Sequence, residues 1–194
     1  MAQDIPVYLF TGFMDSGKTT LVEETLFENN FGDGSKGIII MCEDGEKEYD
    51  EAKLATINFK LVTVEEEEDF TPAKLQEIQD TYPTMTNTQI RNMLAAFLFT
   101  DNGTWGMDKL LEAKMPEGWV IVQSLATVDS TTYDLYMNNM RAMMQEQVFS
   151  SDVVIFNRTD DDTDRGHLRR TIKNINRKAQ IVYERKDGTI DERP

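Results

Sequence analysis

Cysteine and histidine are almost absent from the sequence, whose 194 residues include one of each, Cys42 and His167. A single cysteine cannot form an intramolecular disulfide, which excludes the small secreted scaffolds that disulfides hold together. A structural zinc site usually takes four Cys or His ligands. Because no second Cys or His stands near it, His167 is predicted to be a surface residue of a helix rather than a zinc ligand.

Basic residues are also scarce. The chain has 20 Lys and Arg against 35 Asp and Glu, which gives a formal net charge of −15. Proteins that bind nucleic acid neutralise its phosphates with basic surface, so this composition argues against a nucleic-acid partner. It does not argue against a nucleotide, because a few local donors and one Mg²⁺ ion are enough to neutralise a triphosphate.

Long hydrophobic runs are missing as well. No segment is long enough to span a bilayer, and the N-terminus lacks the charged-then-apolar pattern of a signal peptide. Hydrophobic and charged contents of 40% and 28% are ordinary for a soluble globular protein. We therefore expect a cytoplasmic protein without membrane insertion, with one domain over residues 1–184 and a frayed, charged tail over residues 185–194.

A phosphate-binding pattern near the N-terminus organises the rest of the chain. The apolar run Val7–Phe10 is typical of a buried strand, and residues 12–19 then match G-x-x-x-x-G-K-T. Apolar residues follow at helical spacing from Leu21. In such a P-loop, backbone N–H groups and the helix N-terminus face the phosphates, the lysine reaches the β- and γ-phosphates, and the next hydroxyl binds Mg²⁺.

The candidate site residues follow from this pattern. The expected phosphate-binding residues are Gly12, Asp15, Ser16, Gly17, Lys18, Thr19 and Thr20. Lys18 is the expected catalytic cation and Thr19 a metal ligand. Asp15 is unusual in an anion-binding loop, and the sequence leaves open whether it points outward or helps to hold metal or water.

Two further acids stand just after apolar runs, where P-loop proteins hold metal-ordering carboxylates. Glu43 follows the predicted strand 38–41 and is either a metal ligand or part of a solvated turn. Asp101 ends the apolar run 93–101, part of which the pattern also allows to be helical. We predict that Asp101 orders the Mg²⁺ ion.

A candidate base-reading segment, Asn157-Arg158-Thr159-Asp160, follows the predicted strand 152–156. The carboxylate of Asp160 can accept hydrogen bonds from both N1–H and the exocyclic amine of guanine, a pair of donors that adenine does not offer. Asn157 is expected to brace the loop, and the stem of Arg158 to cover the face of the base. The alternative is a polar turn that caps a helix.

Strands that alternate with helices predict a doubly wound α/β domain with a mostly parallel sheet. Further strands are expected at 60–64, 119–128 and 179–183, with a helix from Thr71 and a long helix capped by Asp129 or Ser130. The methionines within 137–144 are either core packing or a surface for soft metal or a partner. The acidic run 65–69 is either a solvated connection or a weak metal site.

With these motifs in place, the chain resembles the CobW-like GTPases, relatives of the nickel-insertion GTPases of urease and hydrogenase. The similarity is carried by residues 11–21 (T-G-F-L-G-[SA]-G-K-T-T-L in the family), 43–50, 128–129, 147–160 and 175–182. It implies a SIMIBI-type P-loop fold that binds GTP with Mg²⁺. The chain departs from the family in lacking its C-x-C-C motif and C-terminal domain, in having Arg158 for lysine, and in having Thr100–Gly103 in place of E-x-x-G.

The leading functional hypothesis is a Mg²⁺-dependent GTPase, for which an accessory role in metal or cofactor handling is one option. No catalytic base or arginine finger is visible in the sequence, so we expect slow hydrolysis assisted by an unidentified protein partner or a homodimer. The first alternative is a nucleotide-binding switch or interaction module that does not hydrolyse GTP. The second is an ATP-dependent small-molecule kinase, which the segment 157–160 disfavours.

Overall fold

The computed structural model describes residues 5–13, 16–27, 36–42, 49–57, 59–64, 66–81, 94–100 and 119–191. The elements in chain order are β1 (Ile5–Thr11), α1 (Lys18–Phe27), β2 (Lys36–Met41), α2 (Glu51–Ala55), β3 (Phe59–Thr63), the 3-10 turn η1 (Glu67–Asp69), α3 (Pro72–Thr81), β4 (Leu94–Thr100), β5 (Trp119–Asp129), α6 (Tyr133–Asn139), α7 (Arg141–Phe149), β6 (Val153–Thr159), α8 (Arg165–Ile175) and β7 (Gln180–Arg185).

These strands form one seven-stranded sheet in the order β3-β2-β4-β1-β5-β6-β7. Every pair of neighbours in it is parallel. The chain winds outward from β1 to β2 and β3, returns to β4, and then continues on the other side of β1 through β5, β6 and β7. The carboxyl end of β1 is therefore the point where the strand order reverses, which is where sheets of this kind bind ligands. The predicted doubly wound α/β fold is confirmed.

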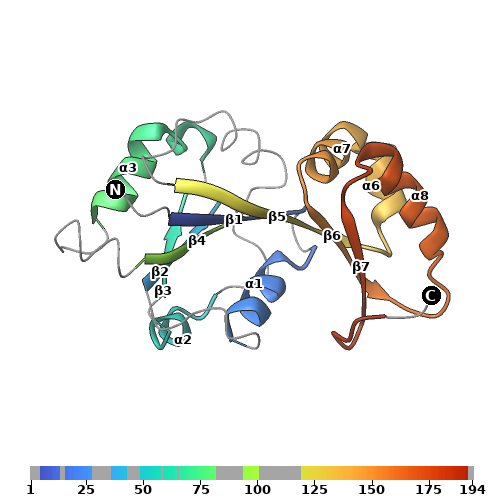
Figure 1. The fold of residues 1–194 in the computed structure, drawn as a ribbon, viewed down its shortest axis with the longest axis horizontal. Helices are drawn as coiled ribbons and strands as arrows, with labels where there is room; N and C mark the ends of the chain where they lie inside the picture. Colours follow the sequence, from blue (N-terminus) through green and yellow to red (C-terminus); the bar gives the residue numbers. More distant parts are fainter. Residues whose placement is uncertain are drawn as a thin grey trace.

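Helices cover both faces of the sheet (Figure 1). Successive side chains of a strand point to opposite faces, and β1 shows this alternation in its core residues. Leu9 joins the cluster that contains Leu75 and Ile78 of α3, whereas Phe10 joins the cluster that contains Val22 of α1. The strand that carries the P-loop is thus fixed from both sides.

A third core cluster joins β5, β6 and β7 to the helices α6, α7 and α8. Tyr133 lies edge-on against Phe156, with ring centroids 5.3 Å apart. Met144 is buried in this cluster, and the methionines at 137, 140 and 143 pack against it, partly buried. The methionines of this region therefore serve as core packing, which is one of the two roles that their helical spacing allowed.

Two helix-level expectations are wrong, and both concern residues 129–149. The expected single long helix is two helices, because Met140 adopts a non-helical backbone (φ −135°, ψ 43°) between α6 and α7. Asn138 and Asn139, which disfavour helix interiors, precede the break. Neither Asp129 nor Ser130 caps α6, which begins after Thr132 without a side-chain cap.

The C-terminal segment is not frayed over residues 185–191. Arg185 belongs to β7, and the chain then turns at Gly188 so that Ile190 forms an antiparallel bridge with Glu184. The N–H of Asp191 donates to the carbonyl of Tyr183 at 2.7 Å, and Asp191 is buried. Its burial between two arginines, described below, explains why this charged segment is ordered. Across the described residues, no helix is long and apolar enough to cross a membrane.

Candidate functional site

The P-loop joins the end of β1 to the start of α1, as the sequence predicts. Lys18 is the first residue of α1, and its side chain is buried with Nζ 2.6 Å from the carbonyl oxygen of Gly12. The ammonium therefore lies across the loop, on the concave side that phosphates occupy in P-loops. Thr19 and Thr20 follow in the first turn of the helix, both partly buried.

Glycine is required at both ends of this loop. Gly12 has φ +153°, and a Cβ there would lie 2.6 Å from the carbonyl oxygen of Thr127 in β5. Gly17 has φ +106°, and a Cβ there would lie 2.6 Å from Nδ2 of Asn157 in β6. Because both positions combine a positive φ with a close backbone or amide neighbour, any side chain would displace the loop from the sheet.

Asn157 braces the P-loop, as predicted. Its Nδ2 donates a hydrogen bond of 2.5 Å to the carbonyl oxygen of Ser16, and the Ser16 hydroxyl lies 2.9 Å from that of Thr127. Asn157 is only 9% exposed, yet its Oδ1 is buried with no hydrogen-bond partner in the structure. A buried acceptor without a donor is uncommon in proteins.

Arg158 is held in a fixed position beside Asn157. Its backbone is left-handed (φ 55°), and Nη1 donates to Oδ2 of Asp129 at 2.5 Å. Partial burial works to raise the pKa of Asp129, but hydrogen bonds from Thr131 and Arg158 outweigh it and leave the pKa below its ordinary value. Asp129 therefore stays ionised and fixes the guanidinium of Arg158. We expected this residue to cap helix α6, which it does not do.

Asp160 lies just after β6, with its side chain about half exposed. Its Oδ1 accepts from the N–H of Asp162 at 2.9 Å, and its Oδ2 lies 3.5 Å from Nζ of Lys186. The hydrogen bond from Asp162, together with Lys186 and Thr163, holds the pKa of Asp160 below its ordinary value. The carboxylate is thus an ionised acceptor beside the base-reading segment.

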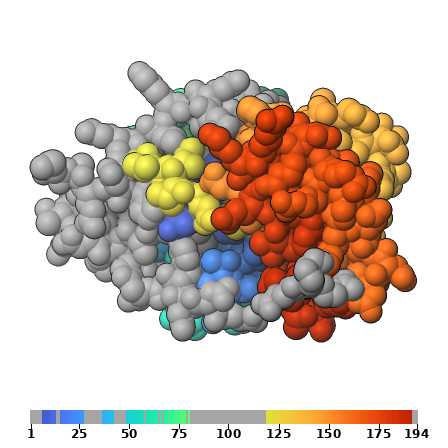
Figure 2. Space-filling view, turned by 45° about the vertical axis from the view of Figure 1, so that its right-hand side comes forward, coloured from blue at the N-terminus to red at the C-terminus, as the bar shows by residue number. Residues whose placement is uncertain are grey.

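A cavity of about 160 Å³ lies between the start of α1 and the ends of β6 and β7. Four separate parts of the chain supply its lining, which is Gly17, Thr20, Leu21, Glu24, Thr127, Ile155, Asn157, Arg158, Glu184, Arg185 and Lys186. Figure 2 shows atoms of α1, in blue, directly beside residues of the C-terminal part, in red. The structure therefore brings the P-loop helix and residues 157–158 to one cavity, with Asp160 outside its lining.

Glu24, Glu184 and Lys186 are cavity residues that the sequence did not reveal. Glu24 stands one helical turn after Thr20, so the helical period alone places it on the same face of α1. Glu184 and Lys186 carry no local pattern, because they reach the cavity only through the pairing of β7 with β6. In that pairing Thr159 lies opposite Arg185, and the Thr159 hydroxyl donates to the carbonyl of Glu184 at 3.0 Å.

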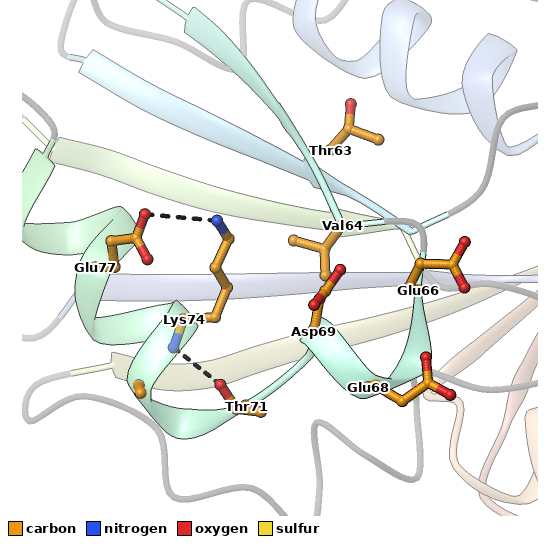
Figure 3. A pocket seen from close by; sticks show the side chains of 9 residues that line it. Thr63, Val64, Glu66, Glu68, Asp69, Thr71, Lys74 and Glu77 are labelled. Atoms are coloured by element: carbon orange, nitrogen blue, oxygen red, sulfur yellow. Dashed lines mark hydrogen bonds and ion pairs between the residues drawn. The ribbon is translucent and has the colours of Figure 1, made fainter.

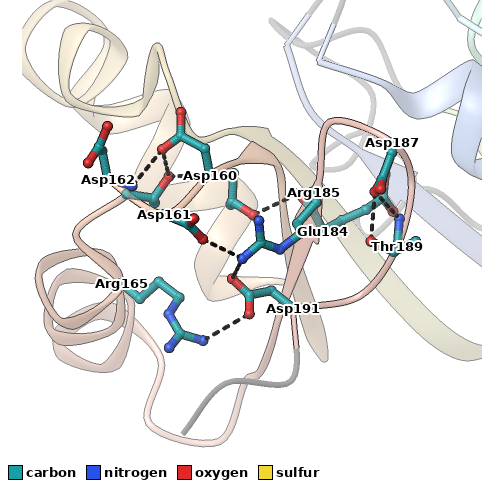
Figure 4. A network of polar contacts seen from close by, with 11 residues as sticks. Asp160, Asp161, Asp162, Arg165, Glu184, Arg185, Asp187, Thr189 and Asp191 are labelled. Atoms are coloured by element: carbon teal, nitrogen blue, oxygen red, sulfur yellow. Dashed lines mark hydrogen bonds and ion pairs between the residues drawn. The ribbon is translucent and has the colours of Figure 1, made fainter.

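An ionic network holds the turn after β7 against the Asp160 loop (Figure 4). Arg185 pairs with Asp161 at 2.7 Å and with Asp191 at 3.7 Å. Arg165 of α8 reaches the same Asp191 at 3.8 Å. The side chain of Asp191 is only 1% exposed, so two arginines share one buried carboxylate. Arg185, which lines the cavity, is thus fixed by carboxylates that are not part of the lining.

Three of the predicted site residues, Asp15, Glu43 and Asp101, lie outside the described residues. Of the expected metal ligands, the structure therefore describes Thr19 alone, at the start of α1. Its hydroxyl is an oxygen ligand of the kind that Mg²⁺ prefers, and it lies in the turn next to buried Lys18. The hydroxyl of Thr19 is therefore suited to the predicted role of a ligand to a hard cation.

The acidic segment after β3 forms a separate hollow of about 600 Å³ (Figure 3). It is lined by Thr63, Val64, Glu66, Glu68, Asp69, Thr71, Ala73, Lys74 and Glu77. Thr71 caps α3 by accepting from the N–H of Lys74, whose Nζ pairs with Glu77 at 3.5 Å. Among the described residues, no group of three or more His, Cys, Asp or Glu has a metal-binding arrangement. The solvated-connection interpretation of residues 66–69 fits the structure.

Comparisons with known proteins agree with this geometry. Residues 6–67 match the family model of the CobW/HypB/UreG nucleotide-binding domain. No curated protein matches the sequence.

Among solved structures, the Zn(II)-bound YjiA GTPase from E. coli is 24% identical with a TM-score of 0.67, over 98% of this chain and 60% of that one. The hydrogenase maturation factor HypB from Archaeoglobus fulgidus is 16% identical with a TM-score of 0.61, over 95% of this chain and 82% of that one. The chain thus spans only 60% of YjiA. The resemblance predicted from the motifs is confirmed over residues 6–67, which match the nucleotide-binding domain of the CobW/HypB/UreG family, and the two solved structures share the fold of this chain.

Proposed function

We propose that the protein binds GTP with Mg²⁺ and hydrolyses it slowly, with the help of a protein partner or a second copy of the chain. The observation that carries this proposal is the cavity between α1 and β6, which has the P-loop at one end and Asn157 in its wall. Asn157 links the cavity wall to the P-loop through its hydrogen bond to Ser16. The phosphate-binding and base-reading segments therefore bind one ligand.

The described residues favour a guanine base. Asp160 is ionised and accepts hydrogen bonds, and Arg158 is fixed beside the cavity by Asp129. The donor pair of guanine, N1–H and the exocyclic amine, matches a carboxylate, whereas adenine presents an acceptor at N1. To make this bidentate contact, Asp160 exchanges its contact with Lys186 for one with the base.

On the phosphate side, Lys18 and the first turn of α1 provide the expected charge stabilisation. Lys18 would exchange the Gly12 carbonyl for the β- and γ-phosphate oxygens. Thr19 would hold Mg²⁺, together with Asp101 and Glu43. When bound, Mg²⁺ would supply positive charge that neutralises the charge developing on the phosphates during transfer.

Assistance from outside the chain is expected because the described arginines around the cavity are already paired. Arg158 binds Asp129, and Arg185 binds Asp161 and Asp191. An arginine finger has to reach the transferred phosphate, and neither side chain is available for that without breaking its pair. The same observation also favours the second candidate, a GTP-binding switch with negligible turnover.

The two candidates share one binding test and differ in one kinetic test. The affinities for GTP and ATP are measured by calorimetry with and without Mg²⁺, and phosphate release is then followed over a range of protein concentrations. Both candidates predict that GTP binds more tightly than ATP and that Mg²⁺ strengthens binding. A turnover rate per molecule that rises with protein concentration supports a homodimeric GTPase, whereas equal affinities for GTP and ATP contradict both candidates.

The proposal extends to an accessory role in metal handling. It rests on the printed descriptions of the two structural relatives, one of which is bound to Zn(II) and the other a hydrogenase maturation factor. At 24% and 16% identity these relatives support the fold, and this chain spans 60% of the first.

A further inference from the structure

We propose that Glu184, at the end of β7, is a second base-reading residue, which accepts a hydrogen bond from the exocyclic amine of guanine. The proposal rests on the proposed binding of GTP in the cavity between α1 and β6. It assigns a role to a residue that belongs to neither the P-loop nor the segment 157–160.

The position of Glu184 is fixed by its backbone. The Thr159 hydroxyl donates to the Glu184 carbonyl at 3.0 Å, and Ile190 forms a bridge with Glu184 from the other side. Thr159 immediately precedes Asp160, so Glu184 stands on the neighbouring strand beside the base-reading segment. Since it also lines the cavity, its side chain is available at the base end of the site.

The carboxylate of Glu184 has no donor of its own. Among the described residues it makes no side-chain hydrogen bond and no ion pair. Partial burial, with the carboxylate of Glu24 nearby, raises the pKa of Glu184 above its ordinary value. Asn157, whose Oδ1 is buried, lines the same cavity. Glu184 is thus an acceptor in the cavity lining, and a ligand that contacts it has to supply a hydrogen-bond donor.

Among the parts of a nucleotide, the base is the one that best supplies the hydrogen-bond donor that Glu184 requires. Phosphate oxygens are excluded at this position, because a carboxylate repels them and they are acceptors themselves. Guanine supplies the two hydrogens of its exocyclic amine in addition to N1–H. Asp160 lies outside the cavity lining and can accept only part of this donor set, which leaves an amine hydrogen for Glu184. The ribose hydroxyls are the competing donors.

The test compares three nucleotides on the full chain and on two variants, Glu184→Gln and Glu184→Ala. Inosine triphosphate lacks only the exocyclic amine, and 2′-deoxy-GTP lacks only one ribose hydroxyl. We expect both variants to bind GTP about 10- to 100-fold more weakly than the parent, because a charge-assisted hydrogen bond is lost. Their affinity for inosine triphosphate should equal that of the parent, so that the preference for GTP over inosine triphosphate disappears.

The matched control is Glu66→Gln, which removes the same charge from an exposed residue outside this cavity. It should leave all three affinities unchanged. Thermal unfolding of the Glu184 variants should be unchanged or shifted upward, because the side chain loses no partner and its repulsion from Glu24 is relieved. A folded variant that loses GTP affinity would therefore have lost a ligand contact.

Two results would overturn the proposal. The first is GTP affinity in Glu184→Ala equal to that of the parent. The second is an equal loss for GTP and inosine triphosphate but none for 2′-deoxy-GTP, which would assign Glu184 to the ribose. Failure of the parent chain itself to bind GTP would instead contradict the proposed function, so the two failures are distinguishable.

Discussion

The two ends of the cavity between α1 and β6 are built in different ways. The phosphate side, residues 12–20, is one continuous stretch at the end of β1. The base side combines residues 157–160, at the end of β6, with residues 184–186, at the end of β7. The two segments are joined by the hydrogen bond from Thr159 to Glu184. The phosphate side is local in sequence, and the base side is assembled by strand pairing.

This difference has consequences for how each side responds to substitution. On the phosphate side one residue, Lys18, provides the buried cation, and its neighbours are held by backbone conformation at Gly12 and Gly17. On the base side, several charged residues are held in place by ion pairs with one another, such as that of Arg185 with Asp161. We therefore expect single substitutions to be all-or-none on the phosphate side and graded on the base side.

Replacing Lys18 should have the largest effect. Lys18→Ala removes the only side chain placed across the P-loop among the described residues, and we expect it to abolish detectable triphosphate binding, a loss of roughly 1000-fold or more. Binding is measured by calorimetry with GTP and Mg²⁺, and folding by circular dichroism. The control is Lys178→Ala, which removes an exposed lysine far from the loop. Near-normal affinity in a folded Lys18→Ala protein would refute the P-loop assignment.

The second effect concerns the base and should be smaller. Asp160→Asn replaces an acceptor with a donor that faces the guanine donors, and we expect GTP affinity to fall roughly 30- to 1000-fold. Xanthosine triphosphate carries a carbonyl in place of the amine, so the variant should prefer it while the parent prefers GTP. The control is Asp162→Asn, whose carboxylate is two residues away and exposed. If the variant and the parent bind GTP alike, residues 157–160 are a turn without a role in recognition.

The same contrast explains what could be predicted from the sequence. The fold and the phosphate side follow from short-range patterns: an apolar strand, two glycines five residues apart, a lysine and a helix. The contact of Asn157 with Ser16 was predictable in kind, because the segment 157–160 has a motif of its own. Each of these patterns consists of residues close together in the chain, although the contact of Asn157 with Ser16 joins residues far apart in it.

The remainder of the site depends on long-range pairing that leaves no local signal. Glu184 enters the cavity because β7 pairs in parallel with β6, and Asp191 is buried because the chain folds back after Gly188. A run of charged residues at the C-terminus is ordinarily exposed, so the pattern of residues 185–191 predicted a frayed tail. The break at Met140 was missed because an isolated pair of asparagines does not always end a helix.

The third prediction tests how far the base side depends on its supporting network. Asp191→Asn leaves Arg165 and Arg185 without their shared buried carboxylate, and we expect the free energy of unfolding to fall by about 3 kcal/mol. GTP affinity should fall less than tenfold, because Asp191 does not face the cavity. Both quantities are measured, by urea denaturation and by calorimetry.

The matched control for Asp191 is Asp161→Asn, which removes the exposed partner of the same Arg185. Asp161 is 76% exposed, so its pair should contribute less than about 1 kcal/mol. Equal destabilisation by the two variants would mean that burial of Asp191 is not what stabilises the turn after β7.

The smallest expected effect is that of zinc, which should add nothing measurable to the phosphate side. Cys42 follows β2 with its side chain buried, and the described acids after β3 form no metal-binding group. A lone thiol with carboxylates makes a poor zinc site, so we expect a dissociation constant no tighter than about micromolar. Zinc is titrated against a fluorescent chelator, for the parent and for Cys42→Ser, which should bind alike. Stoichiometric binding in the nanomolar range, lost in Cys42→Ser, would give the phosphate side a metal site of its own and restore zinc handling as a function.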